Sequence, residues 1–499
     1  MIFSTRVRIC GLLILLISVV FSCTSRFKSN EGEEGYELAK IKCSSCHQFP
    51  EAELLNRQTW AEHVLPKMSS YFGLGYFGNN RYYENDVDEV TISPEEWNKI
   101  LLYYLTESPP DSLEKNKIIT INQSNEHFTE EPMPGSSGNS ATTYIGYHEQ
   151  NIIFANGAAE KLFFFDKALE FIDSVTVDRG VSSIAYKGDS MLILSMGVLY
   201  PSDAPAGTLK LFIRPSKTSS TILDSLQRPV FHTLADLNKD GFEDIIICEF
   251  GDVTGQLSWF ENDSNRSFTK HTLRALPGAT KVVVNDFNKD NLPDVMAMMA
   301  QGDEGIFIYY NLGNKNFREQ RILEFSPSFG SNYFEVVDFN DDGAPDILAT
   351  NGDNGDYPAI LKPYHGVRLY LNDGRSNFKE AIFLPLNGAC KASAVDFDKD
   401  GDLDIAAISY FPDYANNPGE SFVYFKNNGH LDFSAFTISQ VNTGRWLTME
   451  SADIDSDGDT DILLGNAPFA LGNVPDELKE RWKRNVPPML LLRNNTVKR

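Results

Sequence analysis

The chain has 499 residues, a length that allows two or three domains. Its net charge is −25, from 44 basic and 69 acidic residues. Because nucleic acid and anionic lipid are themselves negative, this charge argues against both as partners.

The first 22 residues have the layout of an export signal. Arg6 and Arg8 precede an apolar run, Ile9 to Phe21, that is too short to span a membrane as a helix. The run ends in Val20-Phe21-Ser22-Cys23, which resembles the lipobox of bacterial lipoproteins, although Phe21 is uncommon there. The resemblance implies that Cys23 is lipidated, that residues 23–34 form a tether, and that the protein is an exported outer-membrane lipoprotein on the periplasmic or cell-surface side. The alternative is cleavage to a soluble periplasmic protein.

The next informative stretch is Cys43-Ser44-Ser45-Cys46-His47, which matches the C-x-x-C-H pattern of c-type haem attachment. Two thiols at this spacing can both add to the vinyl groups of a haem, and the adjacent imidazole can then bind the iron. A redox-active dithiol and half of a zinc site are the competing interpretations. An exported chain without a second cysteine pair disfavours zinc.

Helices are predicted on either side of this motif, at Gly35 to Ile41 and at Ser93 to Thr106, where a capping box begins an apolar helical pattern. With Thr59 to Gly73 between them, the arrangement resembles a small class I cytochrome c domain over residues 35–112. The resemblance implies that Cys43 and Cys46 bind one haem c covalently, that His47 is the proximal iron ligand and that Met68 is the distal one.

His63 is the rival distal ligand and would give a lower reduction potential than Met68. Trp60 and Trp97 are expected to pack in the haem pocket without a further role. For such a domain, the acidic charge favours a basic redox partner.

Residues 113–141 are predicted to be a linker, because Pro109-Pro110 closes the first domain and Ser, Pro, Gly and Glu dominate after Ser124. Within the linker, Lys117 to Asn122 (KIITIN) is a strand-forming segment. We expect it to supply the fourth strand of the last repeat unit, which otherwise ends after three strands.

Two sets of four short strands joined by tight turns follow the linker. The first set is Thr142 to Tyr147, Ile152 to Asn156, Lys161 to Phe165 and Phe171 to Val177, and the second is Val181 to Tyr186, Met191 to Ser195, Leu209 to Ile213 and Thr221 to Leu226. Four strands in succession are typical of one propeller blade.

The rest of the chain is organised by a nine-residue acidic loop that occurs five times, every 50 to 58 residues, a period typical of propeller blades. Positions 1, 3, 5 and 9 offer hard oxygen ligands, which suit Ca²⁺ better than a softer metal. Gly at position 6, replaced once by Asn291, permits the positive φ that wraps the chain around an ion. A metal-free acidic turn is the alternative for one copy, but five copies in register disfavour it. The predicted ligands are Asp236, Asn238, Asp240, Asp244, Asp286, Asn288, Asp290, Asp294, Asp338, Asn340, Asp342, Asp346, Asp396, Asp398, Asp400, Asp404, Asp453, Asp455, Asp457 and Asp461.

Each loop joins two apolar segments of strand length, and a third and a fourth strand follow. These units resemble the FG-GAP/VCBS repeat family, the calcium-loop propellers also found in integrin α chains. The resemblance implies a multidomain protein in which a small all-α cytochrome c domain precedes an all-β seven-bladed propeller over residues 142–499. Up to five Ca²⁺ ions are then structural cofactors, one in each of five blades.

Long connections between second and third strands are expected on the propeller face opposite the calcium loops. They span Met196 to Gly207, Asn351 to Gly366, Tyr410 to Glu420 and Gly465 to Pro488, and they carry aromatic, Asp, Asn and Arg side chains. Such loops can form a ligand-binding surface, or they can be long because surfaces tolerate insertions. They contain no recognisable catalytic constellation.

Two functions remain open on these observations. In the first, a cell-envelope cytochrome transfers electrons through one covalent haem, and the protein is a component of an oxidoreductase. Its calcium-stabilised propeller then docks a partner protein or holds a ligand. In the second, the propeller is a surface module that binds a carbohydrate or a protein, and the haem domain is an accessory. We favour electron transfer, because the haem motif is the only group here with definite chemistry.

Overall fold

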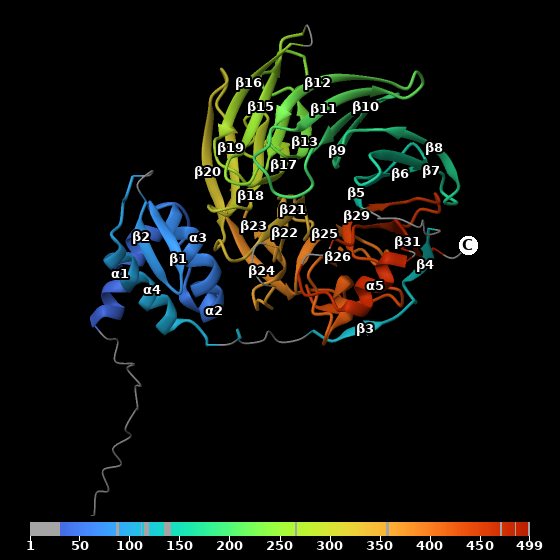
Figure 1. Ribbon diagram of the computed structural model, residues 1–499. Coiled ribbons are helices and arrows are strands. Elements are labelled where there is room, and N and C mark those ends of the chain that lie inside the picture. The colour runs from blue at the N-terminus through green and yellow to red at the C-terminus, as the bar shows by residue number, and fades with distance from the viewer. Residues whose placement is uncertain are drawn as a thin grey trace, which may run out of the picture.

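The computed structural model describes residues 30–85, 89–110, 112–113, 119–133, 141–264, 267–355, 359–469, 472–484 and 486–497. The predicted signal peptide and Cys23 lie outside these residues. Figure 1 shows a helical domain, coloured blue, beside a ring of β-sheets. Within the described residues, no helix is both long and apolar enough to span a lipid bilayer.

The helical domain is built around the crossing of its first and last helices. Its elements are α1 (Asn30–Cys43), η1 (Ala52–Leu54), α2 (Arg57–Thr59), η2 (Trp60–Val64), α3 (Leu65–Ser70), β1 (Leu74–Gly78), β2 (Arg81–Glu84) and α4 (Pro94–Glu107). The predicted capping box of α4 is present, with the Ser93 side chain accepting the Glu96 N–H and the Glu96 carboxylate accepting the Ser93 N–H. At Gly35, α1 approaches α4 so closely that a Cβ atom would lie 2.1 Å from the Lys99 carbonyl oxygen. A larger residue at position 35 would therefore separate the two helices.

Seven antiparallel sheets form the ring, which confirms the predicted seven-bladed propeller. Blade one comprises β5 (Thr142–His148), β6 (Asn151–Asn156), β7 (Lys161–Phe165) and β8 (Phe171–Thr176); blade two β9 (Val181–Lys187), β10 (Ser190–Ser195), β11 (Gly207–Ile213) and β12 (Thr218–Leu226); blade three β13 (Pro229–Ala235), β14 (Asp244–Glu249), β15 (Gln256–Asn262) and β16 (Phe268–Arg274); blade four β17 (Ala279–Asn285), β18 (Asp294–Met299), β19 (Gly305–Asn311) and β20 (Phe317–Glu324). Blade five comprises β21 (Ser331–Val337), β22 (Asp346–Asn351), β23 (Gly366–Asn372) and β24 (Phe378–Pro385); blade six β25 (Ala389–Val395), β26 (Asp404–Ser409), β27 (Phe422–Asn427) and β28 (Phe433–Thr437); blade seven β29 (Trp446–Ala452), β30 (Asp461–Asn466), β31 (Met489–Asn494) and β4 (Phe128–Pro132).

The first strands of neighbouring blades contact one another all the way round the ring, so these strands surround the axis. The second strands of blades three to seven are buried at every residue. Each of these strands lies inside a sheet whose two faces are covered by adjacent blades. This position explains why their sequences are mostly apolar after the initial Asp.

The ring closes through a strand from the linker, but not through the segment predicted for it. β4 pairs antiparallel with β31 and becomes the outer strand of blade seven. The end of the predicted segment instead forms β3 (Ile121–Gln123), which adds in parallel to β28 of blade six. The prediction was wrong because the β-branched residues of KIITIN suggest a strand more strongly than FTEEP does. An outer strand with one buried aromatic, Phe128, does not need that composition.

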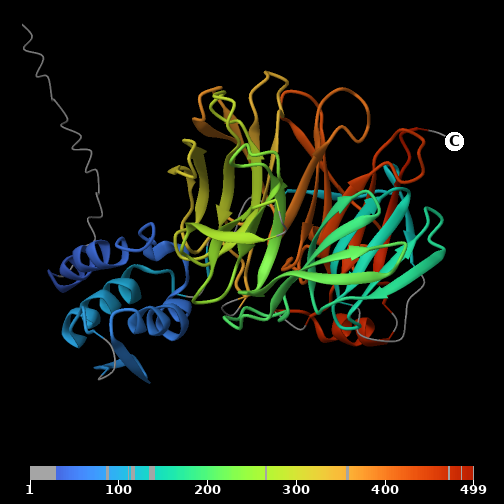
Figure 2. The same cartoon turned by 90° about the horizontal axis from the view of Figure 1, so that it is seen from above.

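The helical domain packs against the propeller, as Figure 2 shows from above. The hydroxyl of Tyr364 donates to the Leu54 carbonyl oxygen at 2.7 Å. Ile360, from the same connection between β22 and β23, packs against the apolar cluster of the helical domain. The two domains therefore meet at one of the long loops predicted from the sequence.

Candidate functional site

The five acidic loops all join the first and second strands of their blades, and each is closed by its own carboxylates. In the blade-five loop, Asp338 accepts the N–H groups of Asp342 (3.0 Å) and Gly343 (2.8 Å). Position 6 has a positive φ in every loop, 66° at Asn291 and between 82° and 99° at the four glycines. The backbone is thus already wrapped as an ion-binding turn requires.

The aspartate at position 9 is fully or almost fully buried in all five loops. Asp346 shows the shared pattern, because it accepts the N–H of Phe339 at 3.0 Å and the N–H of Asn372, at the end of the third strand, at 2.8 Å. Burial first, and then neighbouring carboxylates, raise the pKa of every one of these carboxyls, to about 6 at Asp404 and Asp461. A bound cation would favour the ionised form.

Carboxylates gather most closely in blades six and seven. In blade six, three carboxylate oxygens lie within 4.8 Å of one another, one each from Asp396, Asp398 and Asp404. In blade seven, the same holds for one oxygen each of Asp453, Asp455 and Asp457. The other three loops have an asparagine at position 3, whose amide oxygen is also a hard ligand. In blades six and seven, three of the four predicted ligands of each loop are therefore brought together, and their chemistry fits Ca²⁺.

The C-x-x-C-H residues lie at the C-terminal end of α1 and in the turn after it. Cys43 is half-buried beside Tyr104, and burial raises the pKa of its thiol to about 11, whereas Cys46 is exposed. His47 donates its Nδ1–H to the Gln48 carbonyl oxygen at 2.8 Å. This hydrogen bond leaves the lone pair of Nε2 available to a metal.

The two candidate distal ligands lie on neighbouring turns of one helical stretch, with His63 on η2 and Met68 on α3. Met68 and Cys43 pack against the same apolar cluster, and both are half-buried. In this cluster Trp60 donates its Nε1–H to the Ala52 carbonyl oxygen at 2.9 Å. Trp97 Nε1 is buried and has no well-formed hydrogen bond within the described part of the chain.

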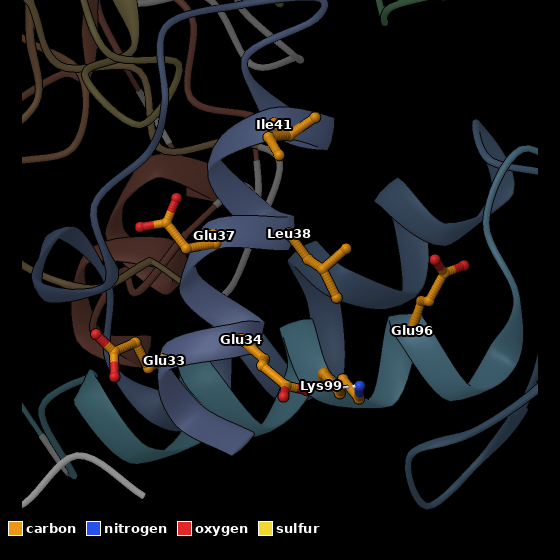
Figure 3. Close-up of a pocket in the computed structure, with 7 residues that line it drawn as sticks. All are labelled: Glu33, Glu34, Glu37, Leu38, Ile41, Glu96 and Lys99. Carbon is orange, nitrogen blue, oxygen red and sulfur yellow. Dashed lines mark hydrogen bonds and ion pairs between the residues drawn. The ribbon is translucent and has the colours of Figure 1, made fainter. Parts of the chain in front are cut away.

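An acidic hollow of about 520 Å³ lies between α1 and α4 (Figure 3). It is lined by Glu33, Glu34, Glu37, Leu38, Ile41, Glu96 and Lys99. Lys99 pairs with Glu34 at 2.7 Å, which leaves the lining acidic.

Aromatic side chains of the long loops contact one another, although Tyr200 stays 54% exposed. Tyr200 and Phe469 lie 6.1 Å apart between ring centroids, and Tyr414 and Trp482 are equally close. The Asn473 side chain donates to the Ala359 carbonyl oxygen at 2.7 Å. The last loop contains a helix that the sequence analysis missed, α5 (Asp476–Arg484). Asp356 and Tyr357, from the long connection between β22 and β23, lie outside the described residues.

The first strands around the axis carry a charged cluster that the sequence analysis also missed. The third residues of β17, β21 and β25 are Lys281, Tyr333 and Lys391. Lys281 Nζ donates to the Tyr333 hydroxyl at 2.5 Å and lies 3.8 Å from its ring centroid, and Lys391 Nζ lies 5.1 Å from the same centroid. Burial, and then Lys391, lower the pKa of Lys281 to about 7.

Two carboxylates lie two residues further along the first strands, toward the acidic loops. They are Glu335 and Glu450, the fifth residues of β21 and β29, and burial raises the pKa of both. Around the axis, the first strands thus carry cationic side chains nearer the long loops and acidic side chains nearer the nine-residue loops. In the sequence, these residues could have been found by comparing equivalent positions of the first strands, because the lysines and the tyrosine are all third residues and the two glutamates are both fifth residues.

Comparison with known proteins identifies the repeats. A family model of FG-GAP-like repeats matches residues 236–297 and 286–349, so the chain contains FG-GAP-like repeats within a seven-bladed β-propeller. No curated protein matches the sequence.

Several solved structures are similar in fold. The N-terminal domain of Nup159 is 12% identical, with a TM-score of 0.41, and the match covers 76% of this chain and 98% of that one. BBS1N, solved in complex with ARL6DN, is 9% identical over 74% and 96% of the two chains, with a TM-score of 0.45. A putative 6-phosphogluconolactonase from Bacteroides fragilis is 12% identical over 64% and 97%, with a TM-score of 0.41.

Proposed function

We propose that the helical domain carries one covalent haem c and transfers electrons, and that the propeller, made rigid by calcium in its five acidic loops, is the platform on which this domain is held. The observation that carries the proposal is the C-x-x-C-H sequence at the end of α1, with Cys43 against the same apolar cluster as Met68. A bound haem supplies a centre for one-electron transfer.

The roles of the residues follow from their environments. Cys43 and Cys46 would hold the haem covalently, and His47, oriented by its Nδ1–H bond to Gln48, would offer Nε2 to the iron. Met68 is preferred over His63 as the distal ligand, since a half-buried thioether beside an apolar cluster suits a group that must be kept from water.

The acidic hollow between α1 and α4 favours a basic redox partner, because opposite charge steers encounter and orients the two proteins. Together with the export signal and Cys23, the proposed haem domain makes the protein an envelope lipoprotein that is anchored by lipid alone. It would exchange electrons with a soluble or membrane-attached partner.

The first test is the spectrum of the protein matured in a host that attaches haem c. We expect a c-type reduced-minus-oxidised spectrum and, in the oxidised protein, the weak methionine–iron band toward the red. Met68→Ala should lose that band and lower the reduction potential, whereas His63→Ala should leave both unchanged. Covalent haem should be absent from the double variant Cys43→Ala/Cys46→Ala and present in Cys390→Ala. A protein without covalent haem, in which Cys43 and Cys46 oxidise to a disulfide, would support the dithiol interpretation instead.

The charged cluster on the first strands favours a second function, in which the propeller binds a small anionic ligand. Lys281 and Lys391 approach the same tyrosine ring, and their ammonium groups donate to neutral oxygens, the Tyr333 hydroxyl and the Met449 carbonyl. An anion entering from the long-loop side would meet these lysines first, and its hydroxyl groups could donate to Glu335 and Glu450.

We expect galacturonate, an acidic sugar, to raise the melting temperature of the propeller, and galactose to leave it unchanged. Lys281→Met should abolish the rise, while Lys217→Met, which removes a surface ion pair to Asp173, should retain it. Equal behaviour of the acidic and neutral sugars would exclude anion binding by these lysines.

A further inference from the structure

Two of the five acidic loops differ from the others at position 3. In blades three, four and five this residue is an asparagine, whose Nδ2 donates to the position-5 carboxylate at 3.0, 2.8 and 2.9 Å. The amide thus links position 3 to position 5 by a hydrogen bond, where an aspartate at position 3 would repel the position-5 carboxylate. In blades six and seven position 3 is Asp398 or Asp455, which has no such donor.

A side-chain cation takes the place of the missing donor in each of these two loops. Lys426 of β27 contacts the Asp398 carboxylate and lies 3.9 Å from that of Asp400. Arg493 of β31 lies 3.8 Å from the Asp455 carboxylate and 3.6 Å from that of Asp461. Lys426 and Arg493 occupy the same repeat position, directly before the last asparagine of the third strand. Blades three, four and five have Glu261, Tyr310 and Leu371 there.

We propose that Lys426 and Arg493 are built-in counter-ions that keep the loops of blades six and seven folded when calcium is withdrawn, whereas the loops of blades three to five depend on the ion. This inference rests on the proposed calcium role. Four ligand carboxylates with one cation carry the same net charge as the three carboxylates of the other loops. The extra aspartate and the cation therefore form a coupled pair.

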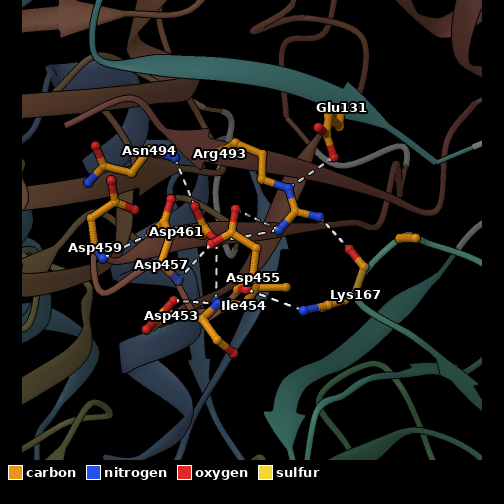
Figure 4. A network of polar contacts seen from close by, with 12 residues as sticks. Glu131, Lys167, Asp453, Ile454, Asp455, Asp457, Asp459, Asp461, Arg493 and Asn494 are labelled. Carbon is orange, nitrogen blue, oxygen red and sulfur yellow. Dashed lines mark hydrogen bonds and ion pairs between the residues drawn. The ribbon is translucent and has the colours of Figure 1, made fainter. Parts of the chain in front are cut away.

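Arg493 also links its loop to the closure of the ring (Figure 4). Its Nε lies 3.1 Å from the Glu131 carboxylate on β4, and its guanidinium donates to the Lys167 carbonyl oxygen of blade one. With 8% of its side chain exposed, it is held in place on three sides. The seam between blades seven and one is thus fixed by a protein cation and keeps its structure at low calcium.

The pair in blade six offers the sharper test, because Lys426→Leu with Asp398→Asn recreates the combination already present in blade five. In EDTA, we expect Lys426→Leu to lower the melting temperature by about 3 °C and the double variant to recover most of the loss. In excess Ca²⁺, the single variant should melt within about 1 °C of the wild type, since the ion replaces the ammonium group. Lys217→Leu, which removes the same charge in a blade without an acidic loop, is the matched control.

The inference is overturned if Lys426→Leu melts like the wild type in EDTA, or if the double variant is no more stable than Lys426→Leu. Hydrogen exchange of the wild type gives an independent measurement that also covers Arg493. In EDTA, amides of residues 236–244, 286–294 and 338–346 should lose protection, and those of 396–404 and 453–461 should keep it. Equal loss in all five loops contradicts the counter-ion role. If the melting temperature of the wild type is the same in EDTA and in excess Ca²⁺, the proposed calcium role itself is contradicted.

Discussion

Replacing Phe128 by Ala is expected to destabilise the propeller by about 3–5 kcal/mol, the usual cost of removing a buried aromatic side chain from a core. Phe128 anchors the closing strand β4, is 2% exposed and packs edge-on against Tyr424 and Phe397, with ring centroids 5.5 and 5.9 Å away. Its loss weakens the contact between the outer strand of blade seven and the core of blade six. Urea unfolding followed by tryptophan fluorescence measures the change.

The matched control for Phe128→Ala is Ile121→Ala in β3. Ile121 is half-buried and its strand extends a sheet that already has four strands, so we expect a loss of about 1 kcal/mol. The opposite order, with Ile121→Ala more harmful, would mean that the KIITIN segment closes the ring, as its sequence suggested.

Closure illustrates where sequence reasoning was sufficient and where it was not. The strands of the blades were predictable because each is marked locally, by apolar residues and by an acidic loop or tight turn of fixed position. The partner of an outer strand is chosen by contacts with residues more than 300 positions away, such as those of Glu130 with Ser439 and Gln440. Nothing local in FTEEP records that choice.

The axial cluster and α5 were missed for different physical reasons. Lys281, Tyr333 and Lys391 come together only because three first strands stand side by side around the axis, which requires the register of all three blades. Helix α5 has the sequence DELKERWKR, which is charged on most sides and buries only Trp482. Its signal is an amphipathic spacing of Leu478 and Trp482, which is weak in a helix of nine residues.

Withdrawal of calcium is expected to lower the melting temperature of the propeller by at least about 10 °C. A site occupied at 100 times its Kd contributes about 2.7 kcal/mol of stability, and up to five such sites act on one cooperative ring. Without the ion, the buried position-9 carboxylates and their neighbours repel one another in the loops of blades three to five. Calorimetry in EDTA and in millimolar Ca²⁺ measures the shift. Mg²⁺ should not replace Ca²⁺, because it requires a smaller, octahedral shell.

Asp338→Asn separates the role of this carboxylate as a metal ligand from its role in the backbone turn. The amide oxygen can still accept the N–H groups of Asp342 and Gly343, so the turn itself should persist. The variant should melt no lower than the wild type in EDTA, since one repelling charge is gone, but should gain less from added Ca²⁺. Asp173→Asn, which removes a carboxylate from a blade without an acidic loop, should keep the full calcium response. If Asp338→Asn instead loses stability equally with and without calcium, its carboxylate serves the turn alone and the ion is held elsewhere.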